Sequence, residues 1–540
     1  MINAISLFRQ GHYQKSLECF ENCLLLNPFD ANIHKSIIEI SMHVSYPTLL
    51  SSIDRALRLF PDCCDFWNYK GLYLKKALLL EESKECFLRA LKVCCNDLER
   101  SSIWLNLGSL YSCQGSVLIF IKSCARAIKL YPDRKETYIT LAFMSNYFKD
   151  VNETAKLIGI DAQSHDDFLT KIYSKMYGGF IYRELGVFEV ESDRIGYVTA
   201  DLVGSACSRF MDAILNHSSM KVFVYSNTPV EQSLLGDKKY YYRDISSLED
   251  SDVISLIKKD KIGHLVDLSG LTRGNRNSLF WKLQTQKKIK LYSYLGYPSN
   301  VCVPGMKRIS DECTEATEFN QSVITMPGFF LCYKNPLVPS NEYEYKNELL
   351  TFGSFAKLEK INDEVIALWK RLLIVCETRG TQAQFVIKSR YFEDPKTRNI
   401  WFDKLGNKSF KLISGALDDP SHMQRYRMMD VQLDTFPYSG TTVSCDSLYM
   451  GVPVVTLKGS RHIERVTASL LTAMGLESEM VANNEEEYIE KAIHVALNRS
   501  SFKVHGKFMS VMCPDKFMNK YEHISPTFGM SDKSHTFEKV

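Results

Sequence analysis

A short polar turn between two apolar segments carries the residues of this chain best suited to bind a phosphate. The stretch "LDTFPYSGTTVSCDSLYMGVPVVT" places Gly440, Thr441 and Thr442 where a strand passes into a helix. Free backbone N–H groups at a helix N-terminus, together with two hydroxyls, favour a bound diphosphate. Asp446 follows one helical turn later, where its carboxylate is placed to accept hydrogen bonds from ribose hydroxyls. The pattern predicts a nucleotide-binding loop.

The elements that must hold this loop alternate between strand and helix. A first series of short apolar strands, each followed by a helical stretch, comprises "RIGYVTAD" from Arg194, "KVFVYSN" from Lys221, "IGHLVDLSG" from Ile262 and "IKLYSYLGYP" from Ile289. A second series comprises "LTFGSFAKL" from Leu350, then "AQFVIKSR" and "FKLISG", and finally "GVPVVTLKG" from Gly451. Such alternation predicts parallel sheets that bind ligands at the carboxyl ends of their strands. Two successive series predict two Rossmann-like domains.

A repeat with a period close to 34 residues precedes these strands. Four helical segments that end in a turn, "CLLLNP", "ALRLFP", "ALKVCC" and "AIKLYP", start at Cys23, Ala56, Ala90 and Ala127 and are separated by 33, 34 and 37 residues. Small residues such as Gly71 and Gly108 let paired helices approach, and aromatic residues fill the space between them. The repeat resembles the tetratricopeptide family. Its concave face commonly holds an extended peptide, and Asn106 is predicted to lie there.

Composition and charge exclude several classes of protein. The 540 residues include 66 basic and 63 acidic side chains, and a net charge of +3 gives no bulk attraction to nucleic acid or to a membrane surface. Sixteen scattered cysteines without a CxxC pair predict neither a disulfide framework nor structural zinc. No apolar run reaches the ~20 residues of a membrane helix, and the N-terminus lacks an apolar signal segment. We therefore expect a protein of a reducing compartment, cytoplasmic or, in a eukaryote, nucleocytoplasmic.

The second strand series carries a resemblance to a known family. The run from "LDTFPYSG" to "RHIERVTASLL", with "FGSFAKLEKINDEVIALW", "RIGYVTAD", "LVDLSGLTRGNR" and "LGYP", resembles the catalytic region of the SPINDLY and O-GlcNAc transferase family. The resemblance covers about residues 1–500 and is weaker in the first Rossmann-like domain. It implies a GT-B glycosyltransferase behind tetratricopeptide repeats. It also implies an inverting transfer of a sugar from a nucleotide donor to Ser or Thr hydroxyls of intracellular proteins.

The combined prediction is an α plus α/β chain in which an N-terminal tetratricopeptide-repeat superhelix is followed by two Rossmann-like domains. The predicted parts are tetratricopeptide repeats at 1–145, a helical connection at 146–192, a first Rossmann-like domain on the acceptor side at 193–345, a second Rossmann-like domain for the nucleotide sugar at 346–524, and a polar tail at 525–540 that we expect to be disordered.

The resemblance also implies roles for individual residues. Lys357, in "FGSFAKLEK", matches the lysine that meets the diphosphate, where its charge would stabilise the departing nucleotide. We expect replacement of Lys357 by alanine to abolish transfer. Asp446 matches the acid that binds the ribose, and His422 and Arg425 match positions beside the base. No cofactor and no metal are expected, because a helix N-terminus and Lys357 can supply the positive charge that a metal otherwise supplies.

The first domain departs from the family pattern. The position of a histidine often proposed as general base holds Ser205, and a second histidine is replaced by Leu271. His264 lies in an apolar strand, and we interpret it as a core histidine. Asp201 and Asp267 are candidates for positioning acceptor or donor groups, although Asp201 is equally placed to cap a helix.

Three hypotheses on function follow. The first is a protein O-glycosyltransferase that uses UDP-GlcNAc, towards which Arg425 favours a uridine base. The second is a protein O-fucosyltransferase that uses GDP-fucose, as in the SPINDLY branch. The third is a pseudoenzyme that lacks the histidines and acts as a repeat-based scaffold. In each case the repeat groove is expected to hold acceptor proteins, with no nucleic-acid partner and no membrane insertion.

Overall fold

The computed structural model describes residues 2–9, 12–43, 48–178, 185, 187–235, 238–296, 303–315, 323–335, 348–406, 408–415 and 421–523. These residues form two compact units. The first contains Met1–Met144, Glu153–Asp161 and Arg390–Gly406, and the second contains Ser145–Asn152, Ala162–Ser389 and Asn407–Val540. The tail predicted at 525–540 lies outside the described residues. None of the helices in the described ranges is both long enough and apolar enough to cross a membrane.

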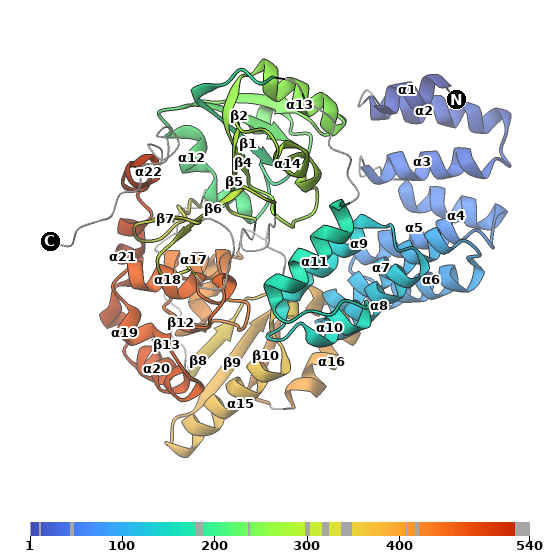
Figure 1. The fold of residues 1–540 in the computed structure, drawn as a ribbon. Coiled ribbons are helices and arrows are strands. Elements are labelled where there is room, and N and C mark those ends of the chain that lie inside the picture. The colour runs from blue at the N-terminus through green and yellow to red at the C-terminus, as the bar shows by residue number, and fades with distance from the viewer. Residues whose placement is uncertain are drawn as a thin grey trace. The chain divides into compact units, whose positions relative to one another are not determined.

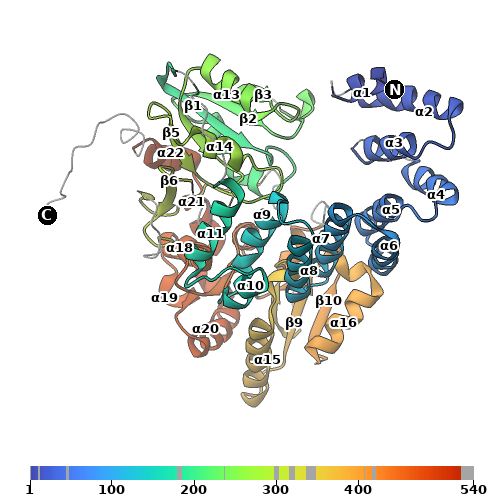
Figure 2. The ribbon, with the colours of Figure 1, turned by 45° about the vertical axis from the view of Figure 1, so that its right-hand side comes forward.

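The N-terminal repeats are antiparallel helix pairs, drawn in blue in Figures 1 and 2. The pairs are α1 (Ile2–Arg9) with α2 (Tyr13–Leu26), α3 (Ala31–His43) with α4 (Leu49–Leu59), α5 (Cys64–Lys76) with α6 (Leu80–Val93), and α7 (Asp97–Cys113) with α8 (Val117–Leu130), followed by α9 (Lys135–Met144). A Cβ atom on Gly71 would lie 2.6 Å from the ring of Phe87, so the glycine allows the close approach of α5 and α6. The predicted helical repeat is confirmed.

One helix of the second strand series packs with the repeats. Helix α16 (Pro395–Leu405) belongs to the first compact unit. The buried indole of Trp401 donates to the carbonyl of Gln114 at 3.0 Å, and the Gln114 amide donates to Thr397 Oγ1 at 3.3 Å. This helix, which lies within the predicted 346–524 domain, therefore packs in the first compact unit.

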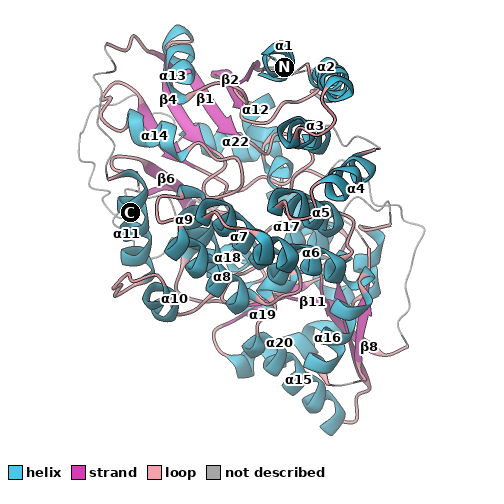
Figure 3. Ribbon diagram, turned by 90° about the vertical axis from the view of Figure 1, so that its right-hand side faces the viewer, coloured by secondary structure: helices cyan, strands magenta, loops and turns pink. Residues whose placement is uncertain are grey.

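The first Rossmann-like domain is built on a parallel sheet of seven strands. The strands are β1 (Glu191–Thr199), β2 (Lys221–Ser226), β3 (Tyr241–Asp244), β4 (Ile262–Asp267), β5 (Lys290–Ser293), β6 (Lys307–Asp311) and β7 (Val323–Met326). Their order is β3-β2-β1-β4-β5-β6-β7, and β1, β2 and β4 lie side by side in Figure 3. Strands β2 and β4 are buried on both faces for most of their length because helices cover the sheet, which is typical of parallel sheets.

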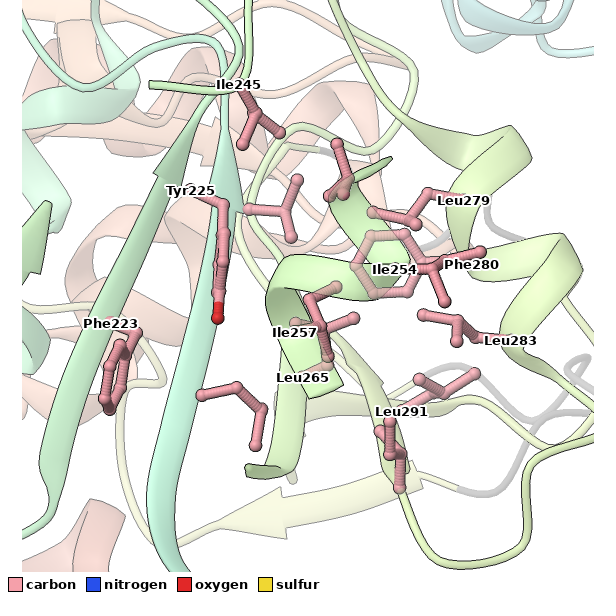
Figure 4. Close-up of a cluster of buried hydrophobic side chains, with 14 of the residues drawn as sticks. Phe223, Tyr225, Ile245, Ile254, Ile257, Leu265, Leu279, Phe280, Leu283 and Leu291 are labelled. Carbon is pink, nitrogen blue, oxygen red and sulfur yellow. The ribbon is translucent and has the colours of Figure 1, made fainter. Parts of the chain in front are cut away.

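The core of this domain lies between the sheet and two helices. Helices α13 (Asp250–Lys259) and α14 (Asn277–Leu283) turn apolar side chains towards Leu265 of β4 and Leu291 of β5 (Figure 4). The predicted connection at 146–192 contains α10 (Asn152–Leu157) and α11 (His165–Tyr177). Tyr177 of α11 stacks on Trp281 of α14 with ring centroids 5.2 Å apart, so α11 packs on this domain.

The second Rossmann-like domain has a six-stranded parallel sheet. Its strands are β8 (Leu350–Ser354), β9 (Ala383–Lys388), β10 (Phe410–Ile413), β11 (Val431–Leu433), β12 (Val454–Leu457) and β13 (Val481–Ala482), in the order β10-β9-β8-β11-β12-β13. Its helices include α15 (Asp363–Thr378), which runs beside β9 in Figure 2, α17 (Thr442–Tyr449), α18 (Val466–Ala473), α19 (Glu477–Met480) and α20 (Glu485–Leu497). The strand order reverses at β1/β4 in the first sheet and at β8/β11 in the second.

Several elements differ from the sequence prediction. Strands β3, β6, β7 and β13 have two to five residues and were not predicted, because so short a strand carries too few alternating positions to show a period. The C-terminal helices α21 (Val504–Val511) and α22 (Pro514–His523) follow the second sheet, yet α22 packs against α12 (Asp212–Asn216) of the first domain. The Tyr521 hydroxyl of α22 lies 3.2 Å from that of Tyr197 in β1. Helix α22, which lies within the predicted 346–524 domain, therefore packs on the first Rossmann-like domain.

Gly108 offers a test of the repeat packing. A Cβ atom there would lie 2.7 Å from the Phe120 ring and 2.8 Å from Ser123 Cβ. We expect Gly108→Ala to destabilise the repeats by about 1–3 kcal/mol, because a methyl group is forced into a filled interface. The measurement is the urea midpoint of the helical circular dichroism signal. Ser102→Ala on the same helix is the control, since the Ser102 hydroxyl bonds back to the Leu98 carbonyl of its own helix at 3.2 Å. Equal midpoints for both variants would contradict the account.

Candidate nucleotide-sugar site

The candidate site lies where the strand order of the second sheet reverses. The loops that follow β8 and β11 leave the carboxyl ends of two adjacent strands, whose chains continue to opposite sides of the sheet. Ligands of open α/β sheets bind at such a point. The loop after β8 carries Lys357 and Lys360, and the loop after β11 runs from Asp434 to the start of α17 at Thr442.

A buried carboxylate shapes the loop after β11. Asp434 Oδ1 accepts hydrogen bonds from the backbone N–H groups of Gly440 at 2.6 Å and Thr435 at 2.9 Å. Asp434 Oδ2 accepts from the Thr456 hydroxyl of β12 at 2.8 Å. Burial raises the pKa of Asp434, while these hydrogen bonds oppose the rise. The conformation of the loop is therefore set by a side chain beneath it.

Gly440 has a different role from the one predicted. Its N–H group binds Asp434, so it is not a phosphate donor. A Cβ atom on Gly440 would lie 2.2 Å from Ser444 Oγ, which explains why a glycine is needed there. Thr441 and Thr442 are half-buried at the start of α17, and no acceptor lies on their N–H groups among the described residues. The donors expected from the loop are thus the N–H groups of Thr441 and Thr442.

Lys360 is the lysine that reaches the loop. Its ammonium group donates to the Ser439 carbonyl at 2.7 Å and lies 3.6 Å from the centre of the Tyr438 ring. Burial lowers the pKa of Lys360 to about 7, with Asp434 opposing the fall and Lys357 adding to it. The sequence reading missed Lys360, although it stands in the same quoted run as Lys357. The distinguishing feature of Lys360 is its contact with the loop, which depends on tertiary structure and is not visible in the sequence.

Lys357 is exposed and faces the first domain. It begins the short helix Leu358–Lys360, and its charge opposes the rise in pKa that burial causes at Asp201. Because Asp201 follows β1 and Lys357 follows β8, the carboxyl ends of the two sheets face each other. The role predicted for Lys357 at the diphosphate stays a prediction.

Asp446 lies at a contact between the two Rossmann-like domains. Its buried carboxylate accepts hydrogen bonds from the guanidinium of Arg209 and from the hydroxyl of Tyr333. The Asn335 amide in turn donates to Tyr333 at 2.8 Å. Burial raises the pKa of Asp446, and the charge of Arg209 is the first influence that opposes the rise. A ribose bound by Asp446, as predicted, would share the carboxylate with Arg209 and Tyr333.

The residues predicted on the acceptor side, Asp201 and Ser205, follow β1. Asp201 is half-buried, and its carboxylate accepts from the Thr272 hydroxyl at 3.1 Å. It caps no helix in the described part of the chain, so the capping alternative is wrong. The Ser205 hydroxyl donates to the Asp201 carbonyl at 3.0 Å and accepts from the Ser208 N–H at 3.1 Å. Ser205 therefore holds its own loop together.

Asp267 and His264 are structural residues of β4. The Asp267 carboxylate is buried and accepts from the N–H groups of Ser269 at 2.9 Å and Gly270 at 3.1 Å. Burial raises its pKa to about 6, against these two hydrogen bonds. The Asp267 carboxylate therefore shapes the turn after β4, and its predicted role in positioning substrate groups stays a prediction. His264 is buried with its ring stacked on Tyr292, which confirms the core histidine.

The two residues predicted beside the base lie before β11. His422 is buried, and its Nδ1 atom lies 2.6 Å from the ammonium group of Lys388 at the end of β9. The Arg425 guanidinium donates to the Ser421 hydroxyl at 3.0 Å and to the Ser414 carbonyl at 2.5 Å. Their contact with a base stays a prediction. Lys388, which the sequence reading did not single out, is a buried cation beside this position.

An Asp-x-Asp sequence, a pattern that can hold a divalent metal against phosphates, lies in the first Rossmann-like domain. It comprises Asp250, Ser251 and Asp252 in the first turn of α13. Asp250 is buried and pairs with Arg276 at 3.1 Å and with Lys282 at 2.9 Å. The side chains of Arg276 and Lys282 therefore neutralise the Asp250 carboxylate. The Asp-x-Asp sequence lies at the amino end of α13, which connects two strands of the first sheet.

Most of the chain beyond the repeats matches one family of known proteins. The family model described as glycosyl transferase family 41 matches residues 156–331 and 332–519. The chain belongs to glycosyl transferase family 41. The resemblance to the SPINDLY and O-GlcNAc transferase family is thereby confirmed.

Individual members of family 41 show the same relation. A probable UDP-N-acetylglucosamine–peptide N-acetylglucosaminyltransferase SPINDLY from Solanum lycopersicum is 33% identical over 332 residues, which are 57% of this chain and 35% of that protein. The probable enzyme SEC from Arabidopsis thaliana is 25% identical over 330 residues, 57% of this chain and 33% of that protein. The chain spans about a third of the length of these curated relatives.

A solved structure confirms the architecture. A variant of the Thermobaculum terrenum O-GlcNAc transferase superposes with a TM-score of 0.74 at 22% identity, covering 96% of this chain and 98% of that chain. The fold is therefore the predicted one, with helical repeats before two Rossmann-like domains in the GT-B arrangement.

The pKa of Lys360 predicts a pH dependence of stability. Folding lowers this pKa to about 7, whereas a lysine in an unfolded chain titrates near 10.4. Between these values the unfolded state binds more protons, so the free energy of unfolding rises with pH. Below both pKa values the folded protein must bury the charged Lys360 ammonium. Above both pKa values Lys360 is neutral in both states, and the free-energy cost of burying a charge is absent. Lys360→Met should reduce this rise by at most ~1.4 kcal/mol per pH unit.

The measurement is urea unfolding at about pH 7 and about pH 9. Fluorescence of the buried Trp369 is one suitable probe. Lys411→Met is the control, because Lys411 is an exposed lysine of β10 in the same domain and should keep the slope of the parent. A parental slope in Lys360→Met would show that Lys360 is charged throughout.

Proposed function

We propose that this chain transfers N-acetylglucosamine from UDP-GlcNAc to Ser or Thr hydroxyls of proteins. The observation that carries the proposal is the meeting of Lys360 with the loop before α17 at the reversal point of the second sheet. Helix N-terminal N–H groups and a lysine are the groups that stabilise a diphosphate. Membership of family 41, and the naming of its relatives as N-acetylglucosaminyltransferases, agree with the transfer of a sugar from a nucleotide donor.

The leaving group is the part of the reaction that this site serves best. When the glycosidic bond breaks, negative charge develops on the diphosphate oxygen that leaves. The N–H groups of Thr441 and Thr442 and the ammonium of Lys360 would stabilise that charge. An arriving diphosphate favours the protonated form of Lys360 and so raises its pKa from about 7. We assign no metal or other cofactor to the reaction.

The acceptor side has one suitable carboxylate. Asp201 is half-buried at the end of β1, and burial raises its pKa. A carboxylate in this position can orient the acceptor hydroxyl or take its proton, a contribution that is typically ~10²–10⁴-fold. Since Ser205 holds its loop instead of acting as a base, Asp201 is the proposed acceptor-side residue.

The repeats are the proposed acceptor groove. The Asn106 amide of α7 donates to Asn68 Oδ1 of α5 at 2.9 Å, so equivalent positions of consecutive repeats form a row of amide groups. Side-chain amides of this kind can bond an extended peptide backbone. A reducing compartment is also proposed, because the cysteines within the described ranges are all free thiols.

The base of the donor is proposed to be uracil. Arg425 and His422 precede β11, and the Arg425 guanidinium donates to the Ser421 hydroxyl and to the Ser414 carbonyl, which hold it at the position that the resemblance assigns to the base. GDP-fucose is the second candidate donor, because the relatives of higher identity belong to the SPINDLY branch.

A donor panel tests the proposal. Purified protein is incubated with acceptor peptides and UDP-GlcNAc or GDP-fucose in the presence of a chelator, and transfer is followed by mass spectrometry. We expect transfer from UDP-GlcNAc, and we expect Lys360→Met to lower kcat by about 10²-fold or more through loss of leaving-group stabilisation. Lys357→Ala separates the two lysines. A loss at Lys357 without a loss at Lys360 would return the role to the residue predicted from sequence.

Other outcomes reject parts of the proposal. Transfer from GDP-fucose alone would change the donor but keep the site. Transfer that stops with chelator and returns with Mg²⁺ or Mn²⁺ would contradict metal independence. Tight nucleotide binding without transfer or donor hydrolysis, in a folded protein, would identify the chain as a pseudoenzyme.

A further inference from the structure

Two cysteines and a glutamate from separate helices of the repeats meet at one point. Cys64 lies in the first turn of α5, Cys94 follows the last residue of α6, and Glu99 lies in the first turn of α7. Helices α5, α6 and α7 lie side by side in Figure 2. The ligand atoms of the three residues all lie within 4.8 Å of one another. Cys64, Cys94 and Glu99 thus form a cluster that does not correspond to a short sequence motif.

The distances in this cluster suit a tetrahedral metal. Glu99 Oε2 lies 3.1 Å from Cys64 Sγ and 3.8 Å from Cys94 Sγ. With a Zn–S distance of about 2.3 Å and a Zn–O distance of about 2.1 Å, tetrahedral sulfur and oxygen ligands lie about 3.6 Å apart. Both sulfur–oxygen distances therefore lie within about half an ångström of the spacing expected around a zinc ion.

The surroundings of Glu99 also favour a cation. Among the described residues, the side-chain donors to its Oε2 atom are the thiols of Cys64 and Cys94, and a thiol is a weak donor for a carboxylate. Both sulfur atoms belong to buried residues, with exposures of 8% and 5%. Lys35 is within electrostatic reach, but its ammonium group is bonded to Asp65 at 2.7 Å. A carboxylate held by two buried thiols is poorly satisfied without a metal.

The neighbouring cysteines face elsewhere. Each ligand cysteine belongs to an adjacent pair, Cys63 with Cys64 and Cys94 with Cys95. Backbone N–H groups of Asp65 and Phe66 at the start of α5 act on the Cys63 thiol, and Cys95 is exposed with its Sγ atom 3.8 Å from the Val93 carbonyl. Only one thiol of each pair therefore enters the cluster.

We propose that Cys64, Cys94 and Glu99 bind one zinc ion that fastens consecutive repeats to each other. Two thiolates select a soft or borderline cation over Mg²⁺ or Ca²⁺, and water would complete the tetrahedron. Binding displaces the protons of the two thiols, so two protons are released and no oxidant is needed. The expectation of no structural zinc, drawn from the lack of a CxxC pair, is thereby replaced. The proposal concerns the repeats and does not depend on the proposed transfer reaction.

Metal titration of the full chain tests the site. Purified protein is stripped of metal in a reducing buffer and titrated with Zn²⁺, and with Co²⁺ to observe the thiolate charge-transfer absorption. We expect one equivalent to bind and to raise the melting temperature of the repeats. Cys64→Ser, Cys94→Ser and Glu99→Gln should each weaken binding by more than about tenfold, since even outer partners of metal ligands are worth 10–100-fold. Cys63→Ser and Cys95→Ser are the matched controls and should bind as the parent does.

A second measurement needs no variant and so survives any folding defect. Maleimide labelling of the native parent, mapped by mass spectrometry, should be slowed by Zn²⁺ at Cys64 and Cys94 and unchanged at the exposed Cys95. Failure of Zn²⁺ and Co²⁺ to bind, or equal binding by Cys64→Ser and the parent, would overturn the proposal. A Cys64–Cys94 disulfide in freshly purified protein, seen as the loss of two hydrogens, would also overturn it.

Discussion

The carboxylate of Asp434 is buried at the end of β11 and holds donors from three directions. It fixes the N–H groups of Gly440 and Thr435 and the hydroxyl of Thr456. Without it, two buried N–H groups would lose their acceptor, at about 1–3 kcal/mol each. The loop before α17 has its shape because of this single side chain, and everything assigned to the nucleotide follows from the shape of that loop.

Charged side chains lie beneath the loop, against it and beyond it. Asp434 lies beneath it, Lys360 lies against it, and Lys357 and Asp201 lie at the facing ends of the two sheets. Lys360 is neutral or charged with little change in free energy near pH 7, because its pKa is about 7. A site of this kind can take up positive charge when a diphosphate arrives. The contact of Arg209 with Asp446 joins the first Rossmann-like domain to α17, the helix that follows the loop.

The sequence was sufficient for the architecture and insufficient for the details of the site. Helical repeats and long strands produce a periodic spacing of apolar residues that is visible in the sequence, and the polar loop at 434–442 could be found from its composition. Hydrogen bonds between distant residues leave no such period. Arg209 and Asp446 are 237 residues apart, and Lys360 differs from Lys357 only by three positions and by burial. Asp267 shows the same limit, because a carboxylate at a strand end can serve either a ligand or its own turn.

A crystal structure of the chain with UDP, or with GDP if that nucleotide binds more tightly, tests the central claim most directly. The account predicts that the diphosphate oxygens accept hydrogen bonds from the N–H groups of Thr441 and Thr442 and from the Lys360 ammonium. It also predicts that the loop stays bound to Asp434. A diphosphate bound away from this loop, in crystals that contain ordered nucleotide, would contradict the account.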